Sequence, residues 1–382
     1  MIELTIIPTR WRALIALAVT LVASFMLAIA PHTTAYAADD NPANAPLAAA
    51  PLSMQTQANQ ATWYRLAGPI ALDTMKSITS NAAGFKHGDC TTVILATANG
   101  YWDALSASGL AGKYHCPVLL TNPDQLSSQT RSEIARLGVK NIIISGGPAA
   151  VSDSVDRTLK NEMGCTVSRM YGEDASGTAL KTFEMGEKVG DGWGDTLIVA
   201  TVDRYWDALS VAPYAYAKNA PIILADSPNN FTDVNELSND ALKALKGKKF
   251  KRVIICGGTA AVSSGVEAQV PFLFGDSVEI VRLSGPTADY TSAKIAKFCV
   301  DEGMSPERIG AATMDGYWDA LSGASLCGKG NFPIVLVSDS SKGAINDYVK
   351  PRAGTIQTGY VFGGPAAVSD STYSALVAAT KR

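Results

Sequence analysis

Apolar residues recur along the chain as short continuous runs, separated by segments whose pattern is helical. One stretch shows the alternation of strand and helix clearly, in the order 93–97, 103–112, 118–121, 130–137, 142–145 and 153–161. Strands without polar alternation are buried on both faces, as in parallel sheets that helices cover. The pattern therefore predicts a three-layer α/β fold with parallel-rich sheets and right-handed crossovers.

The same pattern occurs three times. The hexapeptide Tyr-Trp-Asp-Ala-Leu-Ser begins at Tyr101, Tyr205 and Tyr317. Before each copy stands an Arg-x-x-Gly segment with a threonine six residues after its glycine, at Arg65/Thr74, Arg169/Thr178 and Arg282/Thr291. The period of roughly one hundred residues is the size of a domain. We expect three tandem modules, over residues 62–164, 165–277 and 278–382.

Two further sequence motifs follow each hexapeptide. The first is a proline with an apolar run, which begins at Pro117, Pro221 and Pro333. The second is Gly-Gly-x-Ala-Ala-Val-Ser, with the glycine pairs Gly146/Gly147, Gly257/Gly258 and Gly363/Gly364. A glycine pair lets the backbone turn tightly out of a strand, and the serine then stands where a helix N-cap is needed. Ser152, Ser263 and Ser369 are the expected N-caps.

The N-terminus has the sequence pattern of a targeting signal. Arg10 and Arg12 precede an apolar run over residues 13–30, followed by Ala-Tyr-Ala at 35–37, which predicts a cleaved signal peptide over residues 1–37. The run is also close to the minimum length of a membrane anchor, which is the alternative. Residues 38–61 are rich in Ala, Asn, Gln and Pro, which is typical of a flexible spacer. Cleavage would leave 30 basic and 34 acidic residues, a net charge of −4.

Composition excludes several classes of function. The chain has no basic block, which argues against nucleic acid or an anionic membrane as a partner. Its six cysteines form no CxxC or Cys/His cluster with zinc spacing, so we expect neither a metal site of this kind nor a cofactor. Cys90 and Cys116 each precede an expected strand at the same end of the sheet. A disulfide between them is a hypothesis if the strands are neighbours.

The combined motifs resemble the cell wall binding repeat 2 family of Gram-positive surface proteins, over nearly all of residues 62–372. The resemblance implies three Toprim-like modules around a pseudo-threefold axis. It also implies non-covalent attachment to an anionic secondary wall polymer, either a cell-wall polysaccharide or a teichoic-acid-like polymer, as in surface-layer and autolysin proteins. One departure is that Ala71, Ala175 and Ala288 replace the arginine of the family's common Arg-Tyr. The expected location is the cell wall of a secreted protein.

The repeated polar and aromatic residues are the candidates for ligand binding. Asp103, Asp207 and Asp319 open helices, so each is either a helix N-cap or first-turn acid, or the group that orients Arg65, Arg169 or Arg282 by a bidentate pair. The arginines either bridge modules or bind an anionic polymer. The third group comprises the pairs Tyr101/Trp102, Tyr205/Trp206 and Tyr317/Trp318, which either pack at an interface or stack on sugar rings. The glycine-rich loops also offer helix N-terminal amides to an anion.

The residues give little support for an enzymatic function. The three histidines, His32, His87 and His115, do not recur between repeats, which argues against a repeated histidine-based nucleophile or acid–base site. The Glu and Asp-x-Asp set of a Toprim-type magnesium centre is missing from every repeat. We therefore expect a binding protein and no enzyme. The alternative is a wall amidase, an autolysin or its modifier, in which these modules are the targeting part.

Overall fold

The structure is a computed structural model that describes residues 60–226 and 235–381. All described elements belong to one compact unit, Thr56–Arg382. The expected signal peptide and all of the expected spacer except residues 60 and 61 lie outside the described residues. No helix among the described residues is both long enough and apolar enough to cross a bilayer.

The expected elements of the first repeat are confirmed with small shifts at their ends. They are β2 (Thr92–Thr97), β3 (Val118–Thr121), α5 (Ser128–Leu137), β4 (Asn141–Ser145) and α6 (Asp153–Asn161). The expected helix over 103–112 is instead two short helices, α3 (Trp102–Ser106) and α4 (Ser108–Lys113). The break falls at Ala107, whose ψ of −6° departs from the value of a regular α-helix.

The other two repeats have the same order of elements. The second contains β5 (Thr166–Met170), α7 (Ala175–Gly186), β6 (Thr196–Thr201), α8 (Trp206–Lys218), β7 (Ile222–Ala225), α9 (Asn239–Leu245), β8 (Arg252–Cys256) and α10 (Ser264–Phe274). The third contains β9 (Glu279–Leu283), α11 (Ala288–Asp301), β10 (Arg308–Thr313), α12 (Trp318–Lys329), β11 (Ile334–Val337), η1 (Ile345–Val349), η2 (Lys350–Arg352), β12 (Thr358–Phe362) and α13 (Asp370–Ala379). The first repeat begins with β1 (Thr62–Leu66) and α2 (Ala71–Ser80).

The strands form three four-stranded sheets in which every pairing is parallel. Their orders are β3-β2-β4-β5, β7-β6-β8-β9 and β11-β10-β12-β1, called here the first, second and third sheets. Each sheet therefore takes its last strand from the next repeat, and the third sheet takes β1 from the first. The repeats of the sequence therefore do not coincide with the sheets. Each sheet contains strands from two repeats, whereas the ranges 62–164, 165–277 and 278–382 are the units of repeated sequence.

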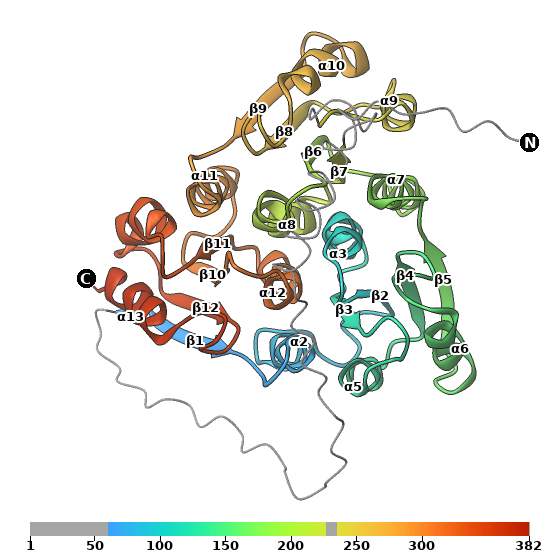
Figure 1. Cartoon of the computed structure of the whole chain (residues 1–382), viewed down its shortest axis with the longest axis horizontal. Helices are drawn as coiled ribbons and strands as arrows, with labels where there is room; N and C mark the ends of the chain where they lie inside the picture. The colour runs from blue at the N-terminus through green and yellow to red at the C-terminus, as the bar shows by residue number, and fades with distance from the viewer. Residues whose placement is uncertain (1–59, 227–234, 382) are drawn as a thin grey trace, which may run out of the picture. The chain divides into compact units, whose positions relative to one another are not determined.

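The central helices α4, α8 and α12 pack against one another, and the three sheets lie outside them (Figure 1). The approach is close because α4 carries glycine at the contact. A Cβ on Gly109 would lie 2.1 Å from the carbonyl oxygen of Ala220, and one on Gly112 would lie 2.0 Å from that of Tyr216. Alanine at either position would force these helices apart. The arrangement matches the expected pseudo-threefold packing.

The two ends of the described chain meet in the third sheet. Trp63 in β1 donates its indole N–H to Oγ1 of Thr380 at 3.0 Å, and Gln60 forms an isolated antiparallel bridge with Lys381. The six cysteines, all described, are buried free thiols, so the disulfide considered between Cys90 and Cys116 is not formed. Non-covalent contacts close the ring of repeats.

Candidate functional site

Six aromatic rings gather on the pseudo-threefold axis, at the carboxyl ends of the central strands β2, β6 and β10. The rings of Tyr101, Tyr205 and Tyr317 contact one another edge to face, with centroids 5.3–5.5 Å apart. Each tyrosine also contacts the tryptophan that follows it, at 4.2, 5.2 and 4.5 Å for Trp102, Trp206 and Trp318. We call these six residues the axial aromatic cluster.

The polar tips of the cluster join neighbouring repeats. The hydroxyl of Tyr101 and the indole N–H of Trp102 both donate to the carbonyl oxygen of Val202, at 3.2 and 2.7 Å. Tyr205 and Trp206 donate in the same way to Met314, at 2.7 and 2.6 Å. These contacts leave the indoles partly exposed, because Trp102 and Trp318 remain 37% and 44% accessible to solvent. Interface packing and an exposed stacking face are therefore compatible.

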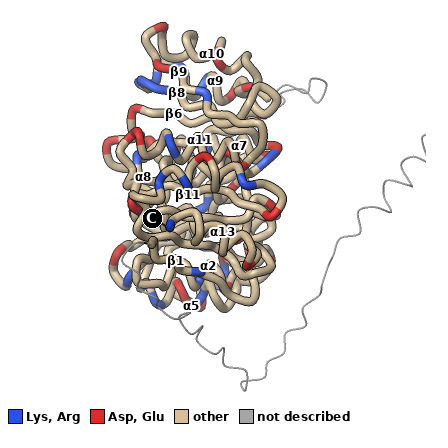
Figure 2. The backbone as a smooth tube through the Cα atoms, turned by 90° about the vertical axis from the view of Figure 1, so that its left-hand side faces the viewer, with Lys and Arg blue, Asp and Glu red and all other residues tan. Residues whose placement is uncertain are grey.

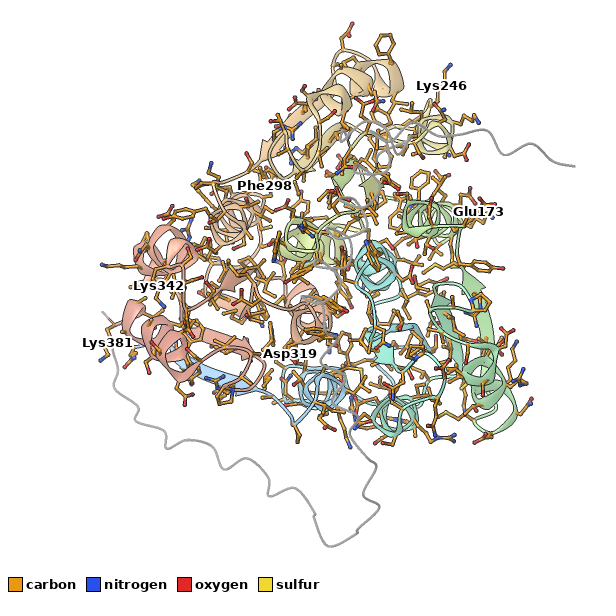
Figure 3. The ribbon with its side chains drawn as sticks, in the orientation of Figure 1. Glu173, Lys246, Phe298, Asp319, Lys342 and Lys381 are labelled. Carbon is orange, nitrogen blue, oxygen red and sulfur yellow. The ribbon has the colours of Figure 1, made fainter. Side chains whose placement is uncertain are left out.

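The three repeated aspartates lie in the first turns of helices α3, α8 and α12, and the N-cap positions are held by the preceding tyrosines. Burial raises the pKa of Asp103 and Asp207 to about 6 and raises that of Asp319 as well. A hydroxyl of the next repeat opposes this shift, since Thr178 hydrogen-bonds Asp103 and Thr74 hydrogen-bonds Asp319. Asp319 lies beside α2, which carries Thr74 (Figure 3).

The threonine that follows each Arg-x-x-Gly segment has a defined role. Its Oγ1 accepts a hydrogen bond from the backbone N–H of the glycine six residues earlier, at 3.1 Å for Thr74, 3.1 Å for Thr178 and 2.9 Å for Thr291. The hydroxyl therefore fixes the turn between the last strand of one sheet and the helix of the next repeat. Thr74 and Thr178 also reach a buried aspartate, Asp319 and Asp103 respectively.

The first glycine of each pair lies directly against an aspartate. Gly146, Gly257 and Gly363 have φ of +114°, +108° and +105°, a conformation that side chains other than glycine rarely adopt. A Cβ at these positions would lie 2.4–2.5 Å from the carboxylates of Asp103, Asp207 and Asp319. The second glycines, Gly147, Gly258 and Gly364, do not have positive φ, and a Cβ on Gly364 would meet nothing within 4 Å.

The serines after these loops occupy the N-caps of α6, α10 and α13, as expected. Ser263 accepts a hydrogen bond from the N–H of Gly265, and Ser369 accepts one from Thr372. These contacts cap α10 and α13, whereas the Ser152 side chain makes no capping bond to α6.

The repeated arginines bind the Gly-Gly loop of the preceding repeat. Arg65 donates to the carbonyl oxygens of Gly363 and Val368 at 3.1 and 2.7 Å, and Arg169 and Arg282 make the equivalent bonds to Gly146/Val151 and Gly257/Val262 at 2.8–3.0 Å. Their acidic partners are Asp370, Asp153 and Glu267, on the helices that follow the loops. The hypothesis that Asp103, Asp207 and Asp319 orient these arginines is wrong in this respect, because the arginines pair with other acids.

Sequence reasoning missed one repeated set of lysines and a single arginine. Lys113, Lys218 and Lys329 end the central helices. Lys113 donates to the carbonyl oxygen of Gly192, and Lys329 forms an ion pair with Asp89 at 2.7 Å, both in the following repeat of the ring. Recurrence at the end of an apolar helix was the signal that could have found them.

Arg204 has no such signal, since glycine precedes the other two Tyr-Trp pairs. Its exposed guanidinium lies 5.8 Å from the ring centre of Trp206.

A cavity of about 330 Å³ opens beside the cluster, at the carboxyl ends of β10 and β11. Trp318 and Asp319 line it, together with the loop that leads into α13. Crevices at the carboxyl ends of parallel strands are common ligand sites in α/β folds.

Outside the cavity the charges are mixed, and Figure 2 shows Lys and Arg interspersed with Asp and Glu. Within residues 60–226 and 235–381, no group of His, Cys, Asp and Glu is arranged to hold a metal ion.

The model of cell wall binding domain 2 matches the chain at residues 65–156, 169–267 and 282–373. The chain belongs to this family. Each matched segment begins at one of the three repeated arginines, so the family's unit is the sequence repeat described above. As a family member, the chain is associated with the bacterial cell wall or surface.

Two proteins of Bacillus subtilis (strain 168) are similar to the chain. The amidase enhancer is 30% identical over 298 residues, which cover 77% of this chain and 37% of that protein. The N-acetylmuramoyl-L-alanine amidase LytC is 26% identical over 254 residues, which cover 66% of this chain and 46% of LytC. The chain thus spans less than half the length of either relative.

Two solved structures have a similar fold. Cwp8 from Clostridium difficile superposes with a TM-score of 0.69 at 25% identity, over 83% of this chain and 51% of that one. Cwp6 from the same organism has a TM-score of 0.72 at 22% identity, over 85% of this chain and 48% of that one. Both likenesses support the arrangement of three parallel sheets.

Proposed function

We propose that the chain attaches non-covalently to the bacterial cell wall by binding an anionic secondary wall polymer through its three repeats. The observation that carries this proposal is the axial aromatic cluster in a member of a cell wall binding family. Its N–H and O–H groups bond across repeat interfaces, while Trp102 and Trp318 stay partly exposed to solvent. An accessible indole face suits the C–H face of a sugar ring.

Anionic groups of the polymer would meet charges and amides around this cluster. Arg204 is exposed beside Trp206, and a guanidinium can hold a phosphate or carboxylate by two hydrogen bonds. The N-terminal amides of α6 and α10 follow the Gly-Gly loops and favour negative charge. We assign Arg65, Arg169 and Arg282 to holding these loops, since their side chains are only 14–16% exposed.

The protein acts by binding, without a catalytic step of its own, and reaches the wall as a secreted product. The Ala-Tyr-Ala pattern at residues 35–37 supports export and cleavage. N-terminal sequencing of the wall-associated protein should return a residue near Ala38, and Met1 would refute cleavage. Binding depends on three similar contacts along one polymer, so avidity increases retention beyond that of any one site.

Sedimentation with purified cell walls tests the proposal directly. The chain should sediment with intact walls and remain in solution with walls from which acid-labile, phosphate-linked polymers have been stripped. High salt should weaken the binding, because ionic contacts between exposed groups are screened. Equal sedimentation with stripped walls would identify peptidoglycan as the ligand and refute the anionic polymer.

A second candidate is the targeting part of a wall amidase or of an amidase modifier. The similarity to an amidase enhancer and to an amidase favours it, because both relatives extend well beyond the shared region. A zymogram on wall material distinguishes the two candidates. Lysis by the purified chain, or increased lysis by an added amidase, would favour the second.

A further inference from the structure

The cavity of the third sheet is lined by both apolar and polar side chains. Apolar contact comes from Trp318 on one wall and from Pro365, Ala366 and Ala367 on another. The polar groups are the side chains of Thr313, Asp315, Ser338, Asp339, Ser369 and Thr372. No lysine or arginine is among the residues that line the cavity. Its volume of about 330 Å³ is at the small end of ligand pockets, of the order needed for one or two sugar rings.

Asp339 is held as an ionised acceptor at this cavity. The hydroxyls of Ser369 and Thr372 both donate to its Oδ1, and these bonds lower the pKa of the carboxyl group. Asp315 is a second exposed carboxylate on the wall, and Asp319 lies deeper. The adjoining cation is Lys342, whose Nζ donates to Oγ1 of Thr372 at 3.3 Å. With two exposed carboxylates and one cation that already has a partner, the cavity is unfavourable for another anion.

The corresponding positions of the other repeats differ in these groups. Pro123 replaces Asp339 in the first repeat, and Val155 and Val266 replace Thr372 in the first and second. The pair of Asp339 and Thr372 therefore belongs to the third repeat, although all three repeats carry the tryptophan. The pseudo-threefold site is chemically asymmetric.

We infer that this cavity binds a hydroxyl-rich sugar ring that carries no acidic group. The indole face of Trp318 covers the C–H face of the ring, and the carboxylates of Asp315 and Asp339 accept hydrogen bonds from its hydroxyls. Phosphate or carboxylate substituents of the polymer stay outside, near Arg204 and the solvent. The inference rests on the proposed wall-polymer function and specifies which part of the polymer the third repeat recognises.

Ligand-observed NMR with N-acetylglucosamine and N-acetylglucosamine 6-phosphate tests the inference on the full chain. The uncharged sugar should bind weakly, and the phosphorylated sugar should bind several-fold more weakly. Trp318→Ala should lower the affinity for the uncharged sugar about tenfold, as expected for the loss of a stacking face. The control variant Phe272→Ala should leave it unchanged, because Phe272 is an exposed aromatic residue of α10 outside the cavity and the axial aromatic cluster.

A second variant keeps the test valid if Trp318→Ala does not fold. Thr372→Val introduces the residue that the other two repeats carry, so it should fold, and it should weaken sugar binding by removing one of the donors that orient Asp339. Tighter binding of the phosphorylated sugar, unchanged affinity in Trp318→Ala, or no binding of either sugar would overturn the inference. Sedimentation of the same preparation with walls separates the failures, since an intact wall interaction without sugar binding refutes only the cavity assignment.

Discussion

Arg65 donates a hydrogen bond to the carbonyl oxygen of Val368 at 2.7 Å, across 303 residues of chain. The same bond joins Arg169 to Val151 and Arg282 to Val262, so one contact fastens each sheet's last strand to the loop of the preceding repeat. A guanidinium that donates to two carbonyls of one loop fixes that loop's shape. Because the first and last repeats are joined by the same contact, the ring closes without a covalent link.

Replacing one of these arginines should lower stability and spare wall binding. Each of Arg65→Ala, Arg169→Ala and Arg282→Ala should reduce the free energy of unfolding by about 1.5–3 kcal/mol, the range for hydrogen bonds to a charged group. Chemical unfolding and wall sedimentation measured on the same preparations provide the check, with the exposed Arg157→Ala as a control for loss of charge. A folded variant with normal stability and lost retention would return the arginines to the binding site.

The two glycines of one loop should respond very differently to alanine. Gly363 has φ +105°, and a Cβ there would lie 2.4 Å from Oδ2 of Asp319, whereas a Cβ on Gly364 would meet nothing within 4 Å. Gly363→Ala should cost about 1–3 kcal/mol from backbone strain alone, and the carboxylate contact adds to this. Gly364→Ala should melt close to the unmodified protein. Equal melting temperatures for the two variants would contradict the assigned turn.

Much of this architecture was predictable because the central strands are apolar on both faces. The runs that became β2, β3 and β4 lie in the interior of a sheet, so their sequences carry a strong signal. The edge strands β1 and β5 are partly exposed and mix polar with apolar residues, and local patterning does not reveal which sheet they join. The exchange of strands between repeats therefore became visible only in the structure.

The site was predictable in its residues but less so in their partners. The repeated Tyr-Trp-Asp and Gly-Gly motifs do lie together at one end of the axis. Charge favours a pairing of the repeated aspartates with the repeated arginines, yet the structure places Thr178 against Asp103 and Asp153 against Arg169. Sequence alone does not show that the arginine's main acceptors are backbone carbonyls, since every residue has one.

The buried Asp207 should make stability fall as pH rises. Burial raises its pKa from 3.8 to about 6, so between about pH 4 and pH 6 the folded state binds a proton that the unfolded state has lost. Its contribution to the free energy of unfolding is therefore greatest below pH 4 and is lost as pH rises to about 6, by about 2–3 kcal/mol.

Asp207→Asn removes this titration. The difference in free energy of unfolding between the variant and the unmodified protein should increase in the variant's favour from pH 4 to pH 6 and stay constant above. Urea unfolding at several pH values measures the difference, and the exposed Asp124→Asn provides the comparison. A difference that does not change over this interval would show that Asp207 keeps an ordinary pKa in the folded protein.

The tryptophans of the axial aromatic cluster should separate stability from binding. Trp102→Phe keeps an aromatic face but loses the N–H that donates to Val202 at 2.7 Å, so it should destabilise the interface by about 1 kcal/mol and retain most wall binding. Trp102→Ala loses both the face and the bond and should lose retention as well. At Trp318, which is 44% exposed, the phenylalanine variant should likewise retain most wall binding and the alanine variant should lose it.

Combining the alanine substitutions tests whether the repeats engage one polymer. If Trp102 and Trp318 contact the same chain, each lost contact lowers the affinity and also the avidity that links the remaining sites. The double alanine variant should then lose far more retention on walls than either single variant, while the double phenylalanine variant, matched for the lost N–H groups, should still sediment. Retention that follows melting temperature across all of these variants would mean that the tryptophans only hold the repeats together, and the wall contact would then lie elsewhere on the ring.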